Sequence, residues 1–186
     1  MQALFRHGGI ADFAAGEAGR AKNSKKRILV GGASGGVGVW LLQLAREAGV
    51  GGIVAVCGSA NVEFVRELGA TEVVDYSREK LGEWRGEKVD LVVDCKGGKS
   101  LEEAWGCVKE GGKVVSICEV PKKREGVESM FFVVEPRGDD LRDVGRLVEE
   151  GKVRVIVDGV WRLEEFEEAI ERVEGGKARG KVILKL

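Results

Sequence analysis

The sequence predicts a doubly wound α/β fold with a mostly parallel sheet, followed by a C-terminal appendage. Apolar runs alternate with helical patterns along most of the chain, which is typical of successive βαβ units. A glycine-rich turn follows the first apolar run and opens an amphipathic helix. Several apolar runs are continuous, as expected for parallel strands covered on both faces. These observations predict a Rossmann-type sheet with the strand order 3-2-1-4-5-6, with its ligand at the switch point between the first and fourth strands.

Each element follows from the period of its apolar residues. Strands are expected at 27–31, 53–57, 72–74, 89–94, 113–117 and 130–134. Helices are expected at 1–10, 37–48, 61–68 and 100–108. Residues 11–24 are rich in Ala, Gly and charge, and a loop is expected there.

The tail continues with a helix–strand–helix–strand pattern. These elements are expected at 139–150, 153–157, 163–173 and 180–184. The predicted organisation is therefore an N-terminal helix and loop (1–26), a dinucleotide-binding domain (27–138) and a C-terminal segment (139–186).

Composition narrows the class of protein. The 186 residues carry a formal net charge of −1 with both signs scattered, which argues against a nucleic-acid-binding surface. No apolar stretch approaches the length of a membrane span, and no secretory signal is recognisable. The four cysteines and the single histidine, His7, lack zinc-site spacing, so no metal is expected. Reduced thiols and a cytoplasmic location are expected.

The glycine turn carries the first functional hypothesis. Gly32, Gly35 and Gly38 fall at a G-x-x-G-x-x-G spacing between the first strand and its helix. Glycine there allows a tight bend, close approach of a pyrophosphate and close packing of helix on strand. Backbone N–H groups at the helix start favour the phosphates. A purely structural turn is the alternative. The candidate cofactor-binding residues of this turn are Gly32, Ser34, Gly35, Gly36, Val37 and Gly38.

Five segments, in order along nearly the whole chain, resemble the medium-chain dehydrogenase/reductases, in particular their zinc-independent quinone-oxidoreductase-like branch. The segments are 28–38, 67–76, 111–116, 149–153 and 176–182. Members of that family begin with a substrate-side β-barrel domain similar to the GroES fold. The sequence starts at residues that resemble the helix after that domain, so a truncated chain without the barrel is expected.

The choice of nicotinamide cofactor depends on the loop after the second strand. Rossmann sites specific for NAD usually carry an Asp or Glu there. Here Ser59 and Asn61 occur and no carboxylate does, which favours NADPH over NADH. The resemblance implies that Tyr76 lies against the 2′-phosphate and that Lys181 lies near the cofactor. The alternative for Tyr76 is a strand-end aromatic ring half buried against the 61–68 helix.

The loops after the fourth and fifth strands are expected to flank the nicotinamide. They place Cys95 and Cys118 among the candidate cofactor-binding residues. The resemblance adds Phe132, for which core packing is the alternative. Neither cysteine has a neighbouring base in the sequence, so thiol catalysis is not expected. No catalytic side chain is assigned.

The resemblance implies an NADPH-dependent oxidoreductase that transfers hydride to a quinone or an α,β-unsaturated carbonyl, with a hydrophobic small molecule as substrate. The alternative is a non-redox protein, ligand-binding or biosynthetic, on a remnant Rossmann domain. An exposed apolar patch is expected near Val157, Val160 and Trp161, where the barrel would lie. A homodimer is expected to form through the sixth strand, near Val133 and Val134.

Overall fold

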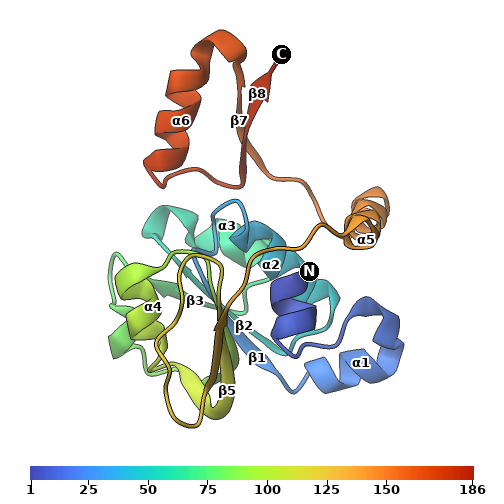
Figure 1. The fold of residues 1–186 in the computed structure, drawn as a ribbon, viewed down its shortest axis with the longest axis vertical. Helices are drawn as coiled ribbons and strands as arrows, with labels where there is room; N and C mark the ends of the chain where they lie inside the picture. Colours follow the sequence, from blue (N-terminus) through green and yellow to red (C-terminus); the bar gives the residue numbers. More distant parts are fainter.

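A six-stranded parallel sheet forms the body of the protein in the computed structural model, which describes residues 1–186 (Figure 1). The strand order is β3-β2-β1-β4-β5-β6, and every neighbouring pair is parallel. The predicted fold class and strand order are therefore confirmed. The strands are β1 (Arg27–Gly31), β2 (Gly52–Cys57), β3 (Glu72–Asp75), β4 (Val89–Asp94), β5 (Val108–Ser116) and β6 (Glu128–Phe131).

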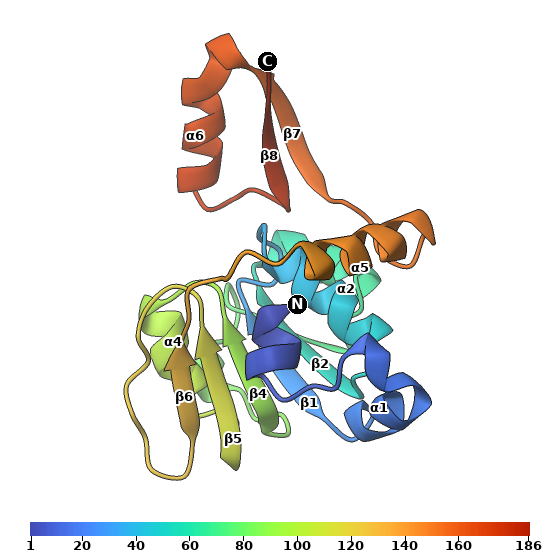
Figure 2. The ribbon, with the colours of Figure 1, turned by 45° about the vertical axis from the view of Figure 1, so that its right-hand side comes forward.

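Helices cover both faces of this sheet. One face packs on α2 (Gly38–Glu47), α3 (Val62–Glu67) and a wide helical turn at Gln2–His7. The other face packs on α4 (Gly98–Ala104). The central strands carry apolar side chains on both faces because both are buried, which explains their continuous apolar runs. Figure 2 shows β4, β5 and β6 side by side in this sheet.

Close packing of α2 on the glycine turn fixes the start of that helix. Gly32 has a φ of +69°, a conformation that glycine adopts without a steric penalty. A Cβ on Gly38 would overlap the Gly32 carbonyl oxygen and lie 2.6 Å from the Cα of Ala33. Gly38 is therefore required by packing, as the glycine spacing predicted.

The loop expected over 11–24 is wrong in its second half, because residues Gly16–Asn23 form the helix α1. The side chain of Asn23 explains the difference. It is buried, accepts from the N–H of Ala11 and donates to the carbonyls of Ala11 and Ala48. These bonds tie the helix end to the end of α2, so tertiary contacts override a weak local pattern.

The strand expected at 153–157 is also wrong, because β7 spans Val157–Arg162. The Gln43 side chain donates to the Arg154 carbonyl at 3.1 Å and accepts from the Arg154 N–H at 2.8 Å. Val153 is buried. The segment before β7 therefore packs on the body through Val153 and the backbone of Arg154, and it does not pair in a sheet.

Strand β6 ends earlier than the predicted 130–134. Its last residue, Phe131, is the register partner of Ser116, where β5 itself ends. Val133 and Val134 lie beyond the strand and are exposed. Similarly, the helix expected at 100–108 is α4, which ends at Ala104, and β5 begins at Val108 where it pairs with Val89.

A small C-terminal unit stands above the carboxyl edge of the sheet (Figures 1 and 2). It contains β7, the helix α6 (Phe166–Glu174) and β8 (Lys181–Lys185), and the two strands pair in parallel. The helix α5 (Gly138–Glu149) precedes it and packs against the core of the body. The predicted division of the chain at residue 138 stays a prediction.

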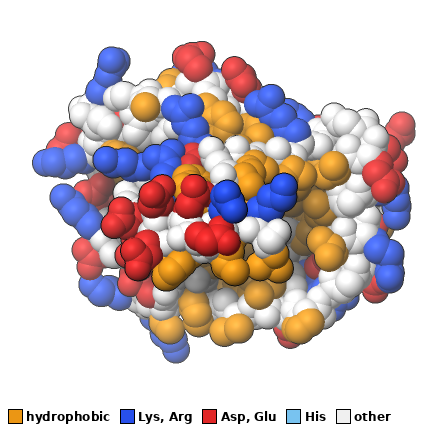
Figure 3. All heavy atoms as spheres, turned by 90° about the horizontal axis from the view of Figure 1, so that it is seen from above, with side chains coloured by type: hydrophobic (Ala, Val, Ile, Leu, Met, Phe, Trp, Pro, Cys, Tyr) orange, Lys and Arg blue, Asp and Glu red, His pale blue; other side chains and the backbone are white.

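Much of the apolar surface of this unit faces outward. Val160 is 61% exposed, and the large apolar side chains of α6 are about half exposed although Ala169 of the same helix is buried. Figure 3 shows this end of the molecule, where hydrophobic side chains gather beside acidic and basic ones. The exposed large apolar residues of the unit are Val157, Val160, Leu163, Phe166, Ile170, Val173, Ile183, Leu184 and Leu186.

Two Gly→Ala substitutions should change stability in opposite directions. Gly38→Ala should lower the free energy of unfolding by about 1–3 kcal/mol, because the new Cβ overlaps the glycine turn. Gly145→Ala should raise it by about 0.5–1 kcal/mol, because Gly145 lies in α5 with open space around its Cα. Urea unfolding measures both changes. Equal effects of the two substitutions would contradict the packing argument.

Candidate cofactor cleft

The glycine turn lies at the carboxyl ends of β1 and β4, where the strand order reverses. Gly35 donates its N–H to the Gly32 carbonyl at 3.1 Å, and Val39 donates to the Gly35 carbonyl at 3.1 Å. The N-terminus of α2 therefore begins directly on the turn. Open α/β sheets bind ligands at this point, and a helix N-terminus favours anionic groups.

The C-terminal unit crosses over the turn. Gly180 donates its N–H to the carbonyl of Ser34 at 3.2 Å. A Cβ on Gly36 would lie 3.0 Å from the Gly180 carbonyl oxygen and 3.2 Å from Nζ of Lys181. The Lys181 ammonium group therefore lies beside the turn, near the expected place of a pyrophosphate.

A cavity of about 860 Å³ lies between the body and the C-terminal unit. Its lining includes these predicted residues: Gly32, Ser34, Gly35, Gly36, Tyr76, Cys95 and Lys181. Three further cations, Lys80, Lys96 and Lys99, also line it and were not predicted. A sequence pattern could not have identified these lysines, because the fold brings them to the cavity from different segments of the chain.

A second cavity, of about 720 Å³, shares Tyr76 and Gly176 with the first. It brings together the predicted residues Ser59, Asn61 and Tyr76. Tyr76 is 63% exposed, and a Cβ on Gly58 would lie 2.9 Å from its hydroxyl oxygen. The Tyr76 ring therefore lies over the loop after β2, and it is not buried against α3.

Arg179 is the residue of this second cavity that the sequence analysis missed. Its Nε donates to Oδ1 of Asn61 at 2.5 Å, and Nη2 donates to the Ala60 carbonyl. Its guanidinium carbon lies 5.5 Å from the centre of the Phe64 ring. The loop after β2 contributes no cation, and the C-terminal unit supplies one from 118 residues further along the chain.

Asp75 places a carboxylate close to the same cavity. The Ser59 hydroxyl donates to it at 2.5 Å, and the N–H of Ser77 donates at 2.9 Å. The hydrogen bond from Ser59 is the main reason that the pKa of Asp75 lies below its ordinary value. The predicted absence of a carboxylate holds for the loop after β2, but β3 supplies one next to Ser59.

Four predicted site residues lie outside both cavities. Val37 and Gly38 belong to the start of α2, beneath the turn. Cys118 follows β5 and is exposed. The Phe132 ring packs against His7, with 4.5 Å between ring centres, as the core-packing alternative would have it.

The two cysteines on the nicotinamide side are poor nucleophiles in this structure. Burial raises the pKa of Cys95, and the Asp94 carboxylate raises it further. The pKa of Cys118 is also raised, by burial first and then by Asp94. Since the thiolate is the reactive form, neither side chain supports covalent chemistry.

No group of three or more His, Cys, Asp and Glu side chains is arranged to hold a metal ion.

No helix of the structure is both long enough and apolar enough to span a membrane.

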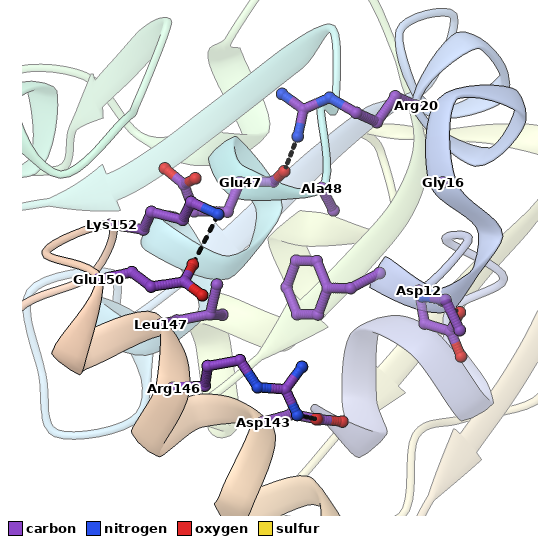
Figure 4. Close-up of a pocket in the computed structure, with 12 residues that line it drawn as sticks. Asp12, Gly16, Arg20, Glu47, Ala48, Asp143, Arg146, Leu147, Glu150 and Lys152 are labelled. Carbon is purple, nitrogen blue, oxygen red and sulfur yellow. Dashed lines mark hydrogen bonds and ion pairs between the residues drawn. The ribbon is translucent and has the colours of Figure 1, made fainter.

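A separate cavity of about 400 Å³ lies between α1, the end of α2 and α5 (Figure 4). Its cations already have protein partners. Arg20 donates to the Glu47 carbonyl, Arg146 pairs with Asp143 at 3.1 Å, and Lys152 pairs with Glu150 at 2.7 Å. Two of its cations are therefore neutralised by carboxylates, and the cavity has neither a glycine turn nor a helix N-terminus at a strand switch point, so the cleft at the glycine turn remains the candidate site.

The sheet order, the glycine turn and the position of the cleft define an α/β protein of the Rossmann class. The profile of the family described as zinc-binding dehydrogenase matches residues 68–184. The chain belongs to this family, within the medium-chain dehydrogenase/reductase superfamily.

Known proteins agree with this assignment. The chain is 45% identical over its whole length to a probable mitochondrial zinc-binding oxidoreductase of Arthroderma benhamiae and covers 58% of that protein. It is 34% identical to the chloroplastic NADPH-dependent alkenal/one oxidoreductase of Arabidopsis thaliana, over 86% of this chain and 40% of that protein. The quinone oxidoreductase of Coxiella burnetii superposes on the whole chain with a TM-score of 0.87 and 26% identity, and 56% of it is covered.

The chain thus spans about half the length of the relatives that it matches. Two of those relatives carry mitochondrial or chloroplastic names. The cytoplasmic location stays a prediction.

An ion pair holds the C-terminal side of the cleft together. Asp158 of β7 accepts from Nε and Nη2 of Arg172 of α6, at 2.6 and 2.8 Å. It also accepts from the Arg179 N–H at 2.8 Å. The Asp158 side chain is only 5% exposed, so one carboxylate joins β7, α6 and the loop before β8.

This ion pair predicts a pH dependence of stability. Hydrogen bonds from Arg172 hold the pKa of Asp158 below its ordinary value. A carboxyl group with a lowered pKa stabilises the fold above its ordinary pKa, and this stabilisation is lost as the pH falls through the lowered value. Asp158→Asn should therefore lower the Tm at pH 6, and the difference from wild type should shrink below about pH 4.

Thermal unfolding from pH 3 to pH 7 measures this difference. The matched control is Asp139→Asn, because Asp139 lies on the exposed surface of α5. The control should change the Tm little at any pH. A difference for Asp158→Asn that stays constant over the whole range would contradict the role of the ion pair.

Proposed function

We propose that the chain binds NADPH in the cleft between the body and the C-terminal unit. We also propose that it acts as an oxidoreductase that reduces a quinone or an α,β-unsaturated carbonyl. The observation that carries the proposal is the glycine turn at the switch point, with Lys181 placed over it from the C-terminal unit. The names of the relatives support the same reading.

The residues of the turn fit a pyrophosphate. Glycine at 32, 35 and 36 leaves backbone open to the cavity, and any Cβ at Gly36 would press on Gly180 and Lys181. Backbone N–H groups at the start of α2 and the Lys181 ammonium group are donors suited to an anion. These groups would hold the diphosphate.

The preference for NADPH rests on the second cavity. Arg179, Lys177 and the Tyr76 hydroxyl line it or border it, and they are suited to a 2′-phosphate. Asp75 opposes this preference through its charge, although Arg78 lies 3.7 Å from it and offsets part of that charge. The loop after β2, which contains Ala60, has no cation of its own. Arg179 therefore decides the preference for NADPH in this proposal.

When bound, the cofactor supplies the hydride, and the chain binds and orients it. The glycine turn and Lys181 fix the diphosphate, and the Arg179 side of the cleft fixes the adenosine end. The loops after β4 and β5 then face the nicotinamide end. A hydrophobic small molecule is the proposed acceptor.

The proposed homodimer forms through the free edge of β6. That strand has only β5 as a neighbour, and the exposed Val133 and Val134 follow it. An exposed strand edge is a template for pairing with a second chain. Light scattering should then give about twice the chain mass of 20.0 kDa, and a monomer would contradict the dimer.

A titration with NADPH and NADH tests cofactor binding. Arg179→Gln should weaken NADPH by about tenfold or more and leave NADH nearly unchanged, because a charge-assisted contact to the 2′-phosphate is lost. Calorimetry measures the two dissociation constants. Arg85→Gln is the matched control, because Arg85 is exposed and lines neither cavity.

The titration separates the candidate functions. Binding of NADPH together with its consumption in the presence of quinones or enones supports the oxidoreductase. Binding without consumption across the panel favours the non-redox alternative. Equal loss of NADPH and NADH affinity in Arg179→Gln would contradict the selective role of Arg179, and binding of neither nucleotide would contradict the proposed cofactor site.

A further inference from the structure

A buried carboxylate lies at the carboxyl end of β4, outside the set of candidate cofactor-binding residues. Asp94 is 1% exposed, and its register partner on β5, Ser116, is fully buried. The Ser116 hydroxyl donates to Oδ2 of Asp94 at 2.8 Å. Burying a carboxylate is costly unless hydrogen bonds compensate for the lost water. A carboxylate at this buried position therefore calls for an explanation.

The remaining bonds of Asp94 go to its own loop. The N–H of Lys96 donates to Oδ1 at 3.1 Å, and the N–H of Gly97 donates to both carboxylate oxygens at 3.0 and 3.1 Å. Every polar contact of the carboxylate is thus with a donor, and no cation pairs with it. The charge is compensated by the loop after β4 and by Ser116.

Ser116 extends the same network to the loop after β5. Its hydroxyl oxygen accepts from the N–H groups of Cys118 and Glu119, at 3.1 and 3.2 Å. The Glu119 side chain in turn accepts from the N–H of Gly98 at 3.0 Å. The two loops are therefore connected through Asp94 and Ser116.

The loop after β4 packs closely on the glycine turn, and the loop after β5 packs on the loop after β4. A Cβ on Gly32 would lie 3.3 Å from the carbonyl oxygen of Cys95. A Cβ on Gly97 would lie 3.3 Å from the Cβ of Cys118. The hydrogen bonds of Asp94 thus hold the loop that approaches the turn on this side of the cleft.

We infer that Asp94 and Ser116 are a positioning pair, which holds the two loops in the place where the nicotinamide half of the dinucleotide binds. The inference rests on the proposed function. Doubly wound folds bind one half of a dinucleotide on each side of the switch point. Asp94 and Ser116 lie on the β4–β5 side, and Ser59, Tyr76 and Arg179 lie on or over the β2–β3 side.

A parallel pair exists on the other side of the switch point. Asp75 ends β3, accepts from the Ser59 hydroxyl and accepts from the N–H of Ser77 in its own loop. It thus provides a comparison: a half-buried carboxylate that also binds a serine hydroxyl and a loop N–H, and that should act on the adenosine half of the ligand.

The test compares two probes, NADPH and adenosine 2′,5′-bisphosphate, which carries only the adenosine half. In Asp94→Asn the amide nitrogen cannot accept the N–H or hydroxyl donors, so the loops lose their fixed place. The dissociation constant of NADPH should rise about tenfold or more, and that of adenosine 2′,5′-bisphosphate should stay within about twofold. Asp75→Asn should change both constants by a common factor.

Ser116→Ala provides a second variant, which keeps the carboxylate. If Asp94→Asn does not fold, the comparison of the two probes is made with Ser116→Ala. It should weaken NADPH selectively as well. The double variant should lose less than the product of the two single effects, because both substitutions break one network. A purely structural role would lower the Tm and weaken both probes equally.

The outcomes separate this inference from the proposed function. If the wild type binds both probes and the Asp94 and Ser116 variants weaken both by one factor, or neither, the positioning role is overturned while the cofactor site stands. If the wild type binds neither probe, the proposed function fails, and the positioning role fails with it.

Discussion

The contact between the first turn of α2 and the glycine turn is the constraint on which the cleft depends. A Cβ on Gly38 would overlap the backbone of Gly32 and Ala33, so no side chain fits between the helix start and the turn. The helix axis is thereby brought onto the carboxyl end of β1, with its N–H groups near the surface. Every other feature of the site is placed relative to this turn.

The C-terminal unit reaches the turn through few bonds, yet it supplies much of the positive charge. Gly180 binds Ser34, Lys181 lies over Gly36, and Arg179 reaches the loop after β2. A cleft formed between two units in this way has one wall with fixed backbone donors and one wall with side-chain cations. The body fixes the position of the backbone donors. The packing of β8 against β7 and α6 fixes the position of the cations.

The fold was largely predictable because the body repeats one local pattern. Apolar runs and the glycine spacing predicted the sheet order and the first wall of the cleft. The sequence predicted less where long-range contacts decide. Asn23 stabilises α1 through bonds to Ala11 and Ala48, and Gln43 holds Arg154 away from β7. Arg179 and the Asp94–Ser116 pair depend on which strands lie side by side, which a local pattern does not reveal.

The two-stranded sheet of β7 and β8 has a consequence for solubility. Parallel strands are normally buried on both faces, and here both the strand edges and an apolar face meet water. Such edges invite indiscriminate pairing between chains. Lys181 and Lys185 at the two ends of β8, with the glutamates of α6 beside them, are charges of the kind that act as gatekeepers against aggregation. Neutralising these charges should promote association through this end of the molecule, so Lys181, which lines the cleft, also belongs to the charges that limit aggregation.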